Sequence, residues 1–197
     1  MTNQWVTGMQ RARVIALSGV SGAGKTSVIK CLAEAFKSQT LLFDDFVEPN
    51  TYPIDMKAWL HQGADVSQIK SPRFTKALSE LKTLSELKVH SDSQMIFIEE
   101  PFGRERAEIA HLIDHVIMLD MPMEVCLSRV IQRHLKYSND ASTTLSNYLR
   151  KYDDHLRAVY IAAANQVRQS SDLLITNVAT IASIQNTICD WLHDNGK

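Results

Sequence analysis

Residues 14–36 of the chain read VIALSGVSGAGKTSVIKCLAEAF, and this stretch decides the fold that we expect. Its first part, Val14–Leu17, is an apolar run typical of a buried strand. The spacing G-x-x-x-x-G-K-[ST] follows, formed by Gly19, Gly24, Lys25 and Thr26. Apolar residues then recur at helical spacing, at Val28, Ile29, Leu32, Ala33 and Phe36. Strand, glycine loop and helix in this order favour a phosphate-binding loop over a tight turn with a surface lysine.

The residue types explain how such a loop binds phosphate. Glycines let the backbone turn so that successive N–H groups point into one concavity, where the helix N-terminus adds partial positive charge. Lys25 can reach the β- and γ-phosphates, and the Thr26 hydroxyl can ligate Mg²⁺. The predicted cofactors are therefore ATP and Mg²⁺. The residues expected to bind the nucleotide phosphates are Gly19, Ser21, Gly22, Ala23, Gly24, Lys25, Thr26 and Ser27.

Further apolar runs predict the rest of a sheet. They are rich in aliphatic residues and do not alternate with polar ones, as expected of strands covered on both faces. These runs are Thr40–Phe43, Met95–Ile98, Val116–Leu119 and Leu173–Ile175. Helical patterns separate them, after Lys25 and at about Arg73–Lys88, Pro122–Lys136, Ser142–Gln169 and Thr180–His193. The alternation predicts a three-layer α/β P-loop NTPase fold with a five-stranded parallel sheet and ligands beyond the carboxyl ends of the strands.

Length and composition narrow the class of protein. A chain of 197 residues is expected to form one domain, residues 1–197. The net charge of −1 argues against long-range binding to nucleic acid and other polyanions. Three cysteines, far apart and without a C-x-x-C pair, suit a reducing compartment and argue against structural zinc. Without a signal-peptide core or an apolar run of membrane-spanning length, we expect a cytoplasmic protein that binds no membrane; a homodimer is left open.

Acidic residues follow two of the predicted strands. Asp44 and Asp45 come directly after TLLF, where a carboxylate can accept a proton from an attacking hydroxyl or, alternatively, cap the next turn. Glu99 and Glu100 end MIFIEE, where one of them can orient Mg²⁺ or hold substrate. The alternative for this second pair is simple solvent exposure at the end of a strand.

Two arginines predict a lid over the site. Arg129 and Arg133 are four residues apart, hence on one face of a helix, where guanidinium groups can stabilise the charge of a transferring phosphoryl group. A solvated basic face is the alternative. The polar stretch LKYSNDASTT, Leu135–Thr144, lies between two predicted helices and is typical of a mobile flap. Together these features place a short helical lid at about residues 129–144.

These motifs resemble the uridine kinase and nicotinamide riboside kinase group of P-loop nucleoside kinases. SGVSGAGKTS looks like the phosphate loop of that group, and DDFVEP resembles its D-D-F or D-S-F segment. FIEE looks like its strand ending in a glutamate. LDMPMEVCLSRVIQR is similar to its strand, proline and arginine-bearing lid helix.

The resemblance implies roles for individual residues. Asp44 would be the general base on a nucleoside 5′-hydroxyl, and Glu99 would lie near Mg²⁺ or the substrate. Asp55, in YPIDMKAW, would bind the ribose 2′- and 3′-hydroxyls. The arginines that would face the transferring phosphoryl group are Arg129 and Arg133. Backbone groups in DLLITNVAT would line the adenine at Asn177 and Val178.

The predicted function is that of an ATP-dependent small-molecule kinase acting on a hydroxyl, with a nucleoside as the first acceptor. Glu100 and Pro101 in IEEPFG depart from the small residue and apolar stretch expected of a riboside kinase. A nucleoside monophosphate, a sugar and a vitamin-like alcohol therefore stay open as acceptors. A GTP-hydrolysing switch would carry N-K-x-D after a late strand, which the sequence lacks; other nucleotide-hydrolysing switches and a non-catalytic ATP-binding module remain alternatives.

The acceptor pocket is the part of the sequence with the weakest pattern. The span Asn50–Lys70 matches no motif, and its candidates for acceptor contacts are Tyr52, Trp59 and His61. Core packing is the commoner role of a lone tryptophan. Arg104 and Arg106 are further candidates, but the glutamates beside them favour a surface charge cluster.

Overall fold

The computed structural model describes residues 11–87, 95–137 and 140–195. Its centre is a five-stranded parallel sheet with the strand order β2-β3-β1-β4-β5. In this order the strands are β2 (Gln39–Leu42), β3 (Met95–Glu99), β1 (Arg13–Ser18), β4 (His115–Leu119) and β5 (Leu173–Ile175). The predicted α/β fold with a five-stranded parallel sheet is confirmed.

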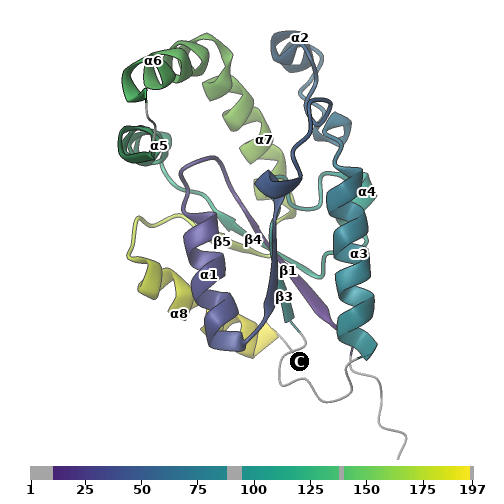
Figure 1. The fold of residues 1–197 in the computed structure, drawn as a ribbon. Coiled ribbons are helices and arrows are strands. Elements are labelled where there is room, and N and C mark those ends of the chain that lie inside the picture. Colours follow the sequence, from purple (N-terminus) through teal and green to yellow (C-terminus); the bar gives the residue numbers. More distant parts are fainter. Residues whose placement is uncertain (1–10, 88–94, 138–139, 196–197) are drawn as a thin grey trace, which may run out of the picture.

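Helices cover both faces of the sheet (Figure 1). Ile15 and Leu17 of β1 join the core on the side of α1 (Lys25–Phe36) and α8 (Ile181–Asn195). Val14 and Ala16 point to the opposite core, which is shared with α3 (Pro72–Leu87), α4 (Ala107–Ala110) and α7 (Arg157–Ser170). Because successive side chains of a strand point to opposite faces, two cores explain why the strand sequences are apolar throughout.

The remaining helices stand above the carboxyl ends of the strands. They are α2 (Met56–His61), α5 (Met123–Tyr137) and α6 (Ala141–Lys151). In Figure 1, α5 and α6 lie on one side of this edge and α2 on the other, with α7 running down between them to the sheet. No helix in the described part of the chain is both long and apolar enough to cross a membrane.

Two details differ from the predictions. The helix predicted for about Ser142–Gln169 is present as one helical run, 141–170, but a π-helical turn at Tyr152–Leu156 lies within it and separates α6 from α7. The second strand ends at Leu42, and Phe43–Phe46 form a 3₁₀ turn that buries the Phe43 ring.

The predicted flap at Leu135–Thr144 is mostly helical where it is described. It contains the end of α5 and the start of α6, and residues 138 and 139 lie outside the described residues. Asp140 caps α6, since its side chain accepts a hydrogen bond from the Thr143 N–H at 3.2 Å.

Candidate active site

The phosphate loop turns tightly between β1 and α1. Gly19, Gly22 and Gly24 have φ values of 132°, 85° and 105°, which are strained for residues with a side chain. A Cβ at Gly19 would lie 2.6 Å from the Leu119 carbonyl oxygen, and one at Gly22 would overlap the carbonyl oxygen of Cys126 in α5. Glycine at these two positions therefore lets the loop pack directly against the end of β4 and against α5.

Lys25, Thr26 and Glu99 form one polar cluster beside this loop. The Lys25 Nζ lies 3.3 Å from Glu99 Oε1 and donates to the Val20 carbonyl oxygen at 3.1 Å. The Thr26 hydroxyl donates to Glu99 Oε2 at 2.6 Å. Glu99 reaches them because β3 lies next to β1, with Leu17 and Glu99 in register. Hydroxyl and carboxylate oxygens are ligands that Mg²⁺ prefers, so Thr26 and Glu99 together fit such an ion.

Asp44 faces the same cavity from the 3₁₀ turn after β2. Burial of its carboxyl raises the pKa of Asp44 above the ordinary value, and the negative charge of Glu99 raises it further. Lys25 and Arg133 are close enough to lower it in part. Among the described residues that line the cavity, Asp44 is present and Asp45 is not. A carboxylate with a raised pKa can act as a general base.

The two arginines of α5 both reach the phosphate loop. Arg129 Nη1 donates to the carbonyl oxygens of Gly22 at 3.3 Å and Ala23 at 3.1 Å. Arg133 Nη2 donates to the Ser21 hydroxyl at 3.3 Å. Both line the cavity, so α5 places two cations directly over the loop.

A single cavity of about 870 Å³ extends from the phosphate loop to a second, far end. Most residues at the far end are apolar or aromatic and come from α7, from the segment around α2 and from the loop after β3. They are Tyr52, Met56, Ile69, Pro101, Phe102, Leu156, Val159, Tyr160, Ala163 and Ala164. The cavity therefore has room for a second molecule beyond the phosphates of a nucleotide.

Comparison with known proteins agrees with this geometry. The chain is 23% identical over 184 residues to a uridine kinase of Bacillus pumilus (strain SAFR-032), covering 82% of this chain and 85% of that protein. Its structure is similar to shikimate kinase from Acinetobacter baumannii in complex with shikimate, with a TM-score of 0.58, 21% identity and coverage of 93% and 94%. The chain has the P-loop kinase fold. No family model matches it.

A second structural neighbour gives the same P-loop kinase fold. This is shikimate kinase from Aquifex aeolicus vf5, with a TM-score of 0.51 and 16% identity, covering 93% of this chain and 98% of that one. The predicted likeness to P-loop kinases is thereby confirmed at the level of the fold, with a distant uridine kinase relative.

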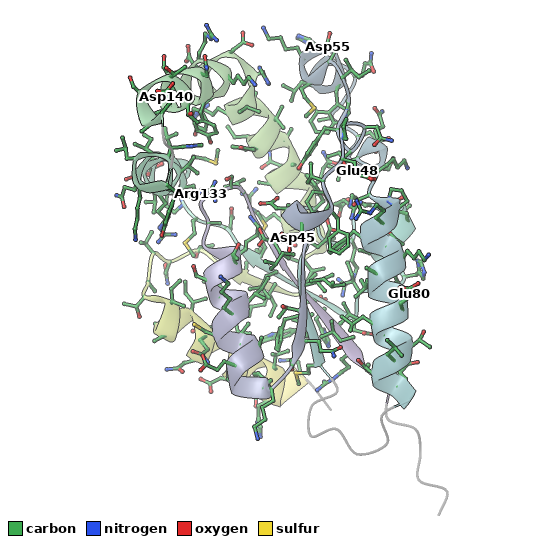
Figure 2. The ribbon with its side chains drawn as sticks, in the orientation of Figure 1. Asp45, Glu48, Asp55, Glu80, Arg133 and Asp140 are labelled. Carbon is green, nitrogen blue, oxygen red and sulfur yellow. The ribbon has the colours of Figure 1, made fainter. Side chains whose placement is uncertain are left out.

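The P-loop kinase fold does not bring every predicted site residue into the cavity. Asp55 is exposed and caps α2, where its carboxylate accepts hydrogen bonds from the N–H groups of Lys57 and Ala58 at 3.0 and 2.9 Å. Figure 2 shows it at the outer end of α2, on the opposite side of the view from Arg133. The ribose role expected for Asp55 therefore has no support in the geometry.

Asn177 and Val178 also lie outside the residues that line the cavity. Both are exposed in the connection from β5 to α8. That connection nevertheless approaches the phosphate loop, because a Cβ on Gly24 would lie 3.9 Å from Ile181 Cδ1 at the start of α8. Their predicted contact with adenine stays a prediction.

Glu100 and Arg106 form a buried ion pair. The alternative of simple solvent exposure is therefore wrong for Glu100, and the surface charge cluster favoured for Arg106 is wrong as well. Both side chains are fully buried. Arg106 donates to the Glu100 carboxylate through Nη2 at 2.5 Å and Nε at 3.2 Å. The guanidinium also donates to Glu108 at 2.8 Å and lies 5.1 Å from the centre of the Phe43 ring. This pair supports the turn that carries Asp44.

The unmatched span contributes one aromatic residue to the cavity. Tyr52 lines it, whereas Trp59 is buried in the core and its indole N–H donates to the Asp65 carbonyl oxygen at 2.9 Å. His61 is exposed and does not line the cavity. The sequence did not predict Tyr160 of α7 as a cavity residue. Helical periodicity indicates which face of a helix is apolar, but it does not indicate whether that face lines a cavity.

Proposed function

We propose that the chain is an ATP-dependent kinase that transfers the γ-phosphoryl group to a hydroxyl of a small molecule. The observation that carries this proposal is the position of Asp44 in the same cavity as the Lys25–Glu99–Thr26 cluster. A general base, a metal-binding oxygen pair and a phosphate loop are what direct phosphoryl transfer requires.

The proposed roles follow from the contacts. The N–H groups of the loop and Lys25 bind the phosphates, and Lys25 exchanges its contact with Glu99 for a phosphate oxygen. Thr26 and Glu99 would hold Mg²⁺, which would supply positive charge that neutralises the phosphates. Asp44 accepts the proton of the acceptor hydroxyl, whose oxygen bonds to the γ-phosphorus as the bond to the bridging oxygen of ADP breaks. Arg129 and Arg133 stabilise the negative charge on the transferring group.

A nucleoside is the first acceptor that we propose. The uridine kinase relative supports it, although 23% identity supports the class of acceptor rather than a particular base. The shikimate kinase neighbours share the fold with this chain, so shikimate belongs in the same screen. Nucleoside monophosphates, sugars and vitamin-like alcohols complete the set.

The test is ADP release by the purified chain with Mg²⁺ and ATP, measured with and without each acceptor. We expect release to depend on an acceptor and the largest rate with a nucleoside. ATP turnover that no acceptor changes would contradict the kinase proposal and favour a nucleotide-hydrolysing protein. Absence of turnover, with ATP bound, would favour a binding module. Turnover with a sugar and with no other acceptor would contradict the proposal of a nucleoside acceptor and leave the kinase proposal standing.

A further inference from the structure

We infer that the far end of the cavity accepts an uncharged alcohol with an apolar or aromatic body and rejects acceptors that carry a phosphate or carboxylate group. This inference rests on the proposed kinase function and concerns the acceptor end of the same cavity. It follows from where the structure places its cations, its hydroxyls and its carboxylates.

The cations that line the cavity all lie at its phosphate end. They are Lys25, Lys30, Arg129 and Arg133, on α1 and α5. Arg129 and Arg133 are hydrogen-bonded to the phosphate loop itself. In the described part of the chain, the far end contributes no lysine or arginine to the lining. Arg133 is also close enough to Tyr160 to lower the pKa of that phenol in part, although its guanidinium donates to the Ser21 hydroxyl of the loop. The phosphates of ATP therefore have cationic partners, whereas an anion on the acceptor would have to compete with those phosphates for Arg133.

The far end offers neutral groups instead. Met56 and Tyr52 line one wall, and Val159 and Tyr160 of α7 line the other. Burial raises the pKa of Tyr52 to about 12, and burial also raises the pKa of Tyr160, so both phenols stay protonated at neutral pH. Two hydroxyls in an apolar wall can orient a neutral polar group, and aromatic rings can contact a flat apolar body.

The nearest cations outside the lining are already occupied. Arg106 lies behind the wall, fully buried, with its donors directed to Glu100, Glu108 and the Ile69 carbonyl oxygen. Lys57 of α2 is exposed and pairs with Asp154 at 2.5 Å. Neither lines the cavity. Arg106 lowers the pKa of Tyr52 in part, but Glu100 raises the pKa of the same phenol, so this ion pair offers a bound anion little net positive charge.

Two carboxylates of the cavity strengthen the discrimination against anionic acceptors. Asp44 and Glu99 both face the cavity close to where the acceptor hydroxyl must lie. An anionic acceptor would be desolvated beside these two charges and the ATP phosphates, while the nearby cations Lys25 and Arg133 already engage Glu99 and the phosphate loop. Sites that leave a charged or polar group unpaired typically discriminate by about 100-fold or more.

Matched pairs of acceptors test the inference on the unmodified protein. Uridine and uridine 3′-monophosphate both carry the 5′-hydroxyl, and only the second carries a phosphate. Methyl quinate and quinate carry the same hydroxyls, and only quinate carries a charged carboxylate. In each pair that turns over, we expect kcat/KM to be at least about 100-fold higher for the uncharged member. An anionic member that reacts equally well would overturn the inference and leave the kinase function standing. Failure of every acceptor would overturn the proposed function as well.

A charge placed in the far wall gives the second test. Met56→Lys adds a cation to the lining and should raise the ratio of anionic to uncharged kcat/KM by about 10-fold or more. Ile54→Lys adds the same charge two residues away at a fully exposed position outside the lining, and should leave the ratio unchanged. Equal ratios in a folded Met56→Lys protein and in Ile54→Lys would overturn the assignment of the far end to the acceptor.

Discussion

Asp44 is the residue at which base catalysis can be tested most directly. Asp44→Asn keeps the shape of the side chain but removes the proton acceptor, so we expect kcat to fall by about 10²–10⁴-fold with little change in the affinity for ATP. Asp45→Asn is the matched control, because Asp45 does not line the cavity. The measurement is steady-state kinetics with ATP binding measured in parallel. If Asp45→Asn lowers kcat more than Asp44→Asn does, the general base is assigned to the wrong member of the pair.

The raised pKa of Asp44 gives a prediction on pH. The base acts in its ionised form, so the rate should fall as the pH is lowered through its pKa. Because burial and Glu99 raise that pKa, the midpoint of the acid limb of kcat/KM should lie above the ordinary value of 3.8. Asp45→Asn removes a charge that raises the same pKa and should move the midpoint downward. A midpoint at or below 3.8, with the fold intact by circular dichroism, would contradict the environment described for Asp44.

Lys25 tests the electrostatic part of the mechanism. Lys25→Ala removes a buried cation next to the transferring group, and we expect phosphoryl transfer to fall by about 100-fold or more. Lys76→Ala is the control, since Lys76 is 77% exposed on α3, far from the lining. Wild-type rates in a folded Lys25→Ala protein would exclude the assigned role of the phosphate loop.

The Glu100–Arg106 pair is predicted to matter for stability. Arg106→Met leaves a carboxylate buried without its partner and should lower the free energy of unfolding by about 3–5 kcal/mol. The double variant Arg106→Met/Glu100→Leu should lose less, because no unpaired charge remains. Urea unfolding measures both. A double variant less stable than Arg106→Met would show that the pair stabilises the fold beyond mutual neutralisation.

At the scale of single residues, the sequence predicts chemistry best where spacing along the chain determines it. Lys25 and Thr26 are fixed by the loop motif, and Glu99 is placed because strands β1 and β3 are neighbours. Asp55 fails because the same carboxylate that can bind a diol can cap a helix, and its distance from the loop is set by tertiary structure. The surface cluster favoured for Arg106 is wrong for a similar reason, since its buried partners depend on how separate elements pack.

At the scale of elements, the lid predicted at about residues 129–144 falls on the second half of α5 and the start of α6, and it stays a prediction. α6 buries no residue completely and packs on α5, so few apolar contacts hold it to the body. We expect amide exchange in the second half of α5 and in α6 to slow when a non-hydrolysable ATP analogue and an acceptor are bound together, because closure excludes water. α3, on the opposite side, serves as the internal control. Equal exchange in α6 with and without ligands would argue against a closing lid.

Strands were easier to predict than the helices around the cavity. Each strand is buried on both faces, which gives a continuous apolar run. The π turn at Tyr152–Leu156 inserts residues into a pattern that otherwise continues, so periodicity indicates one helix across it. α2 has six residues, which is too short for a clear apolar period.

At the scale of the whole molecule, the cavity divides between two parts of the chain. The phosphate end belongs to the loop after β1, to α1 and to α5, while the far end comes largely from the segment around α2 and from α7. Because the two ends share few partners, substitutions such as Lys30→Ala and Met56→Leu should have additive effects on the free energy of activation within about 0.5 kcal/mol. Steady-state kinetics of the single and double variants measure the coupling. A larger coupling energy would show that the two ends act as one unit.

The separation of the two ends also bears on how the chain can change over generations. Replacements around Met56 and along α7 can alter what is recognised at one end while the glycine loop keeps its close approach to β4 and α5. Gly19 and Gly22 allow almost no exchange, because any Cβ there would meet backbone atoms. Proteins descended from such a chain would therefore come to differ in the acceptor that they bind before they differ in the reaction that they catalyse.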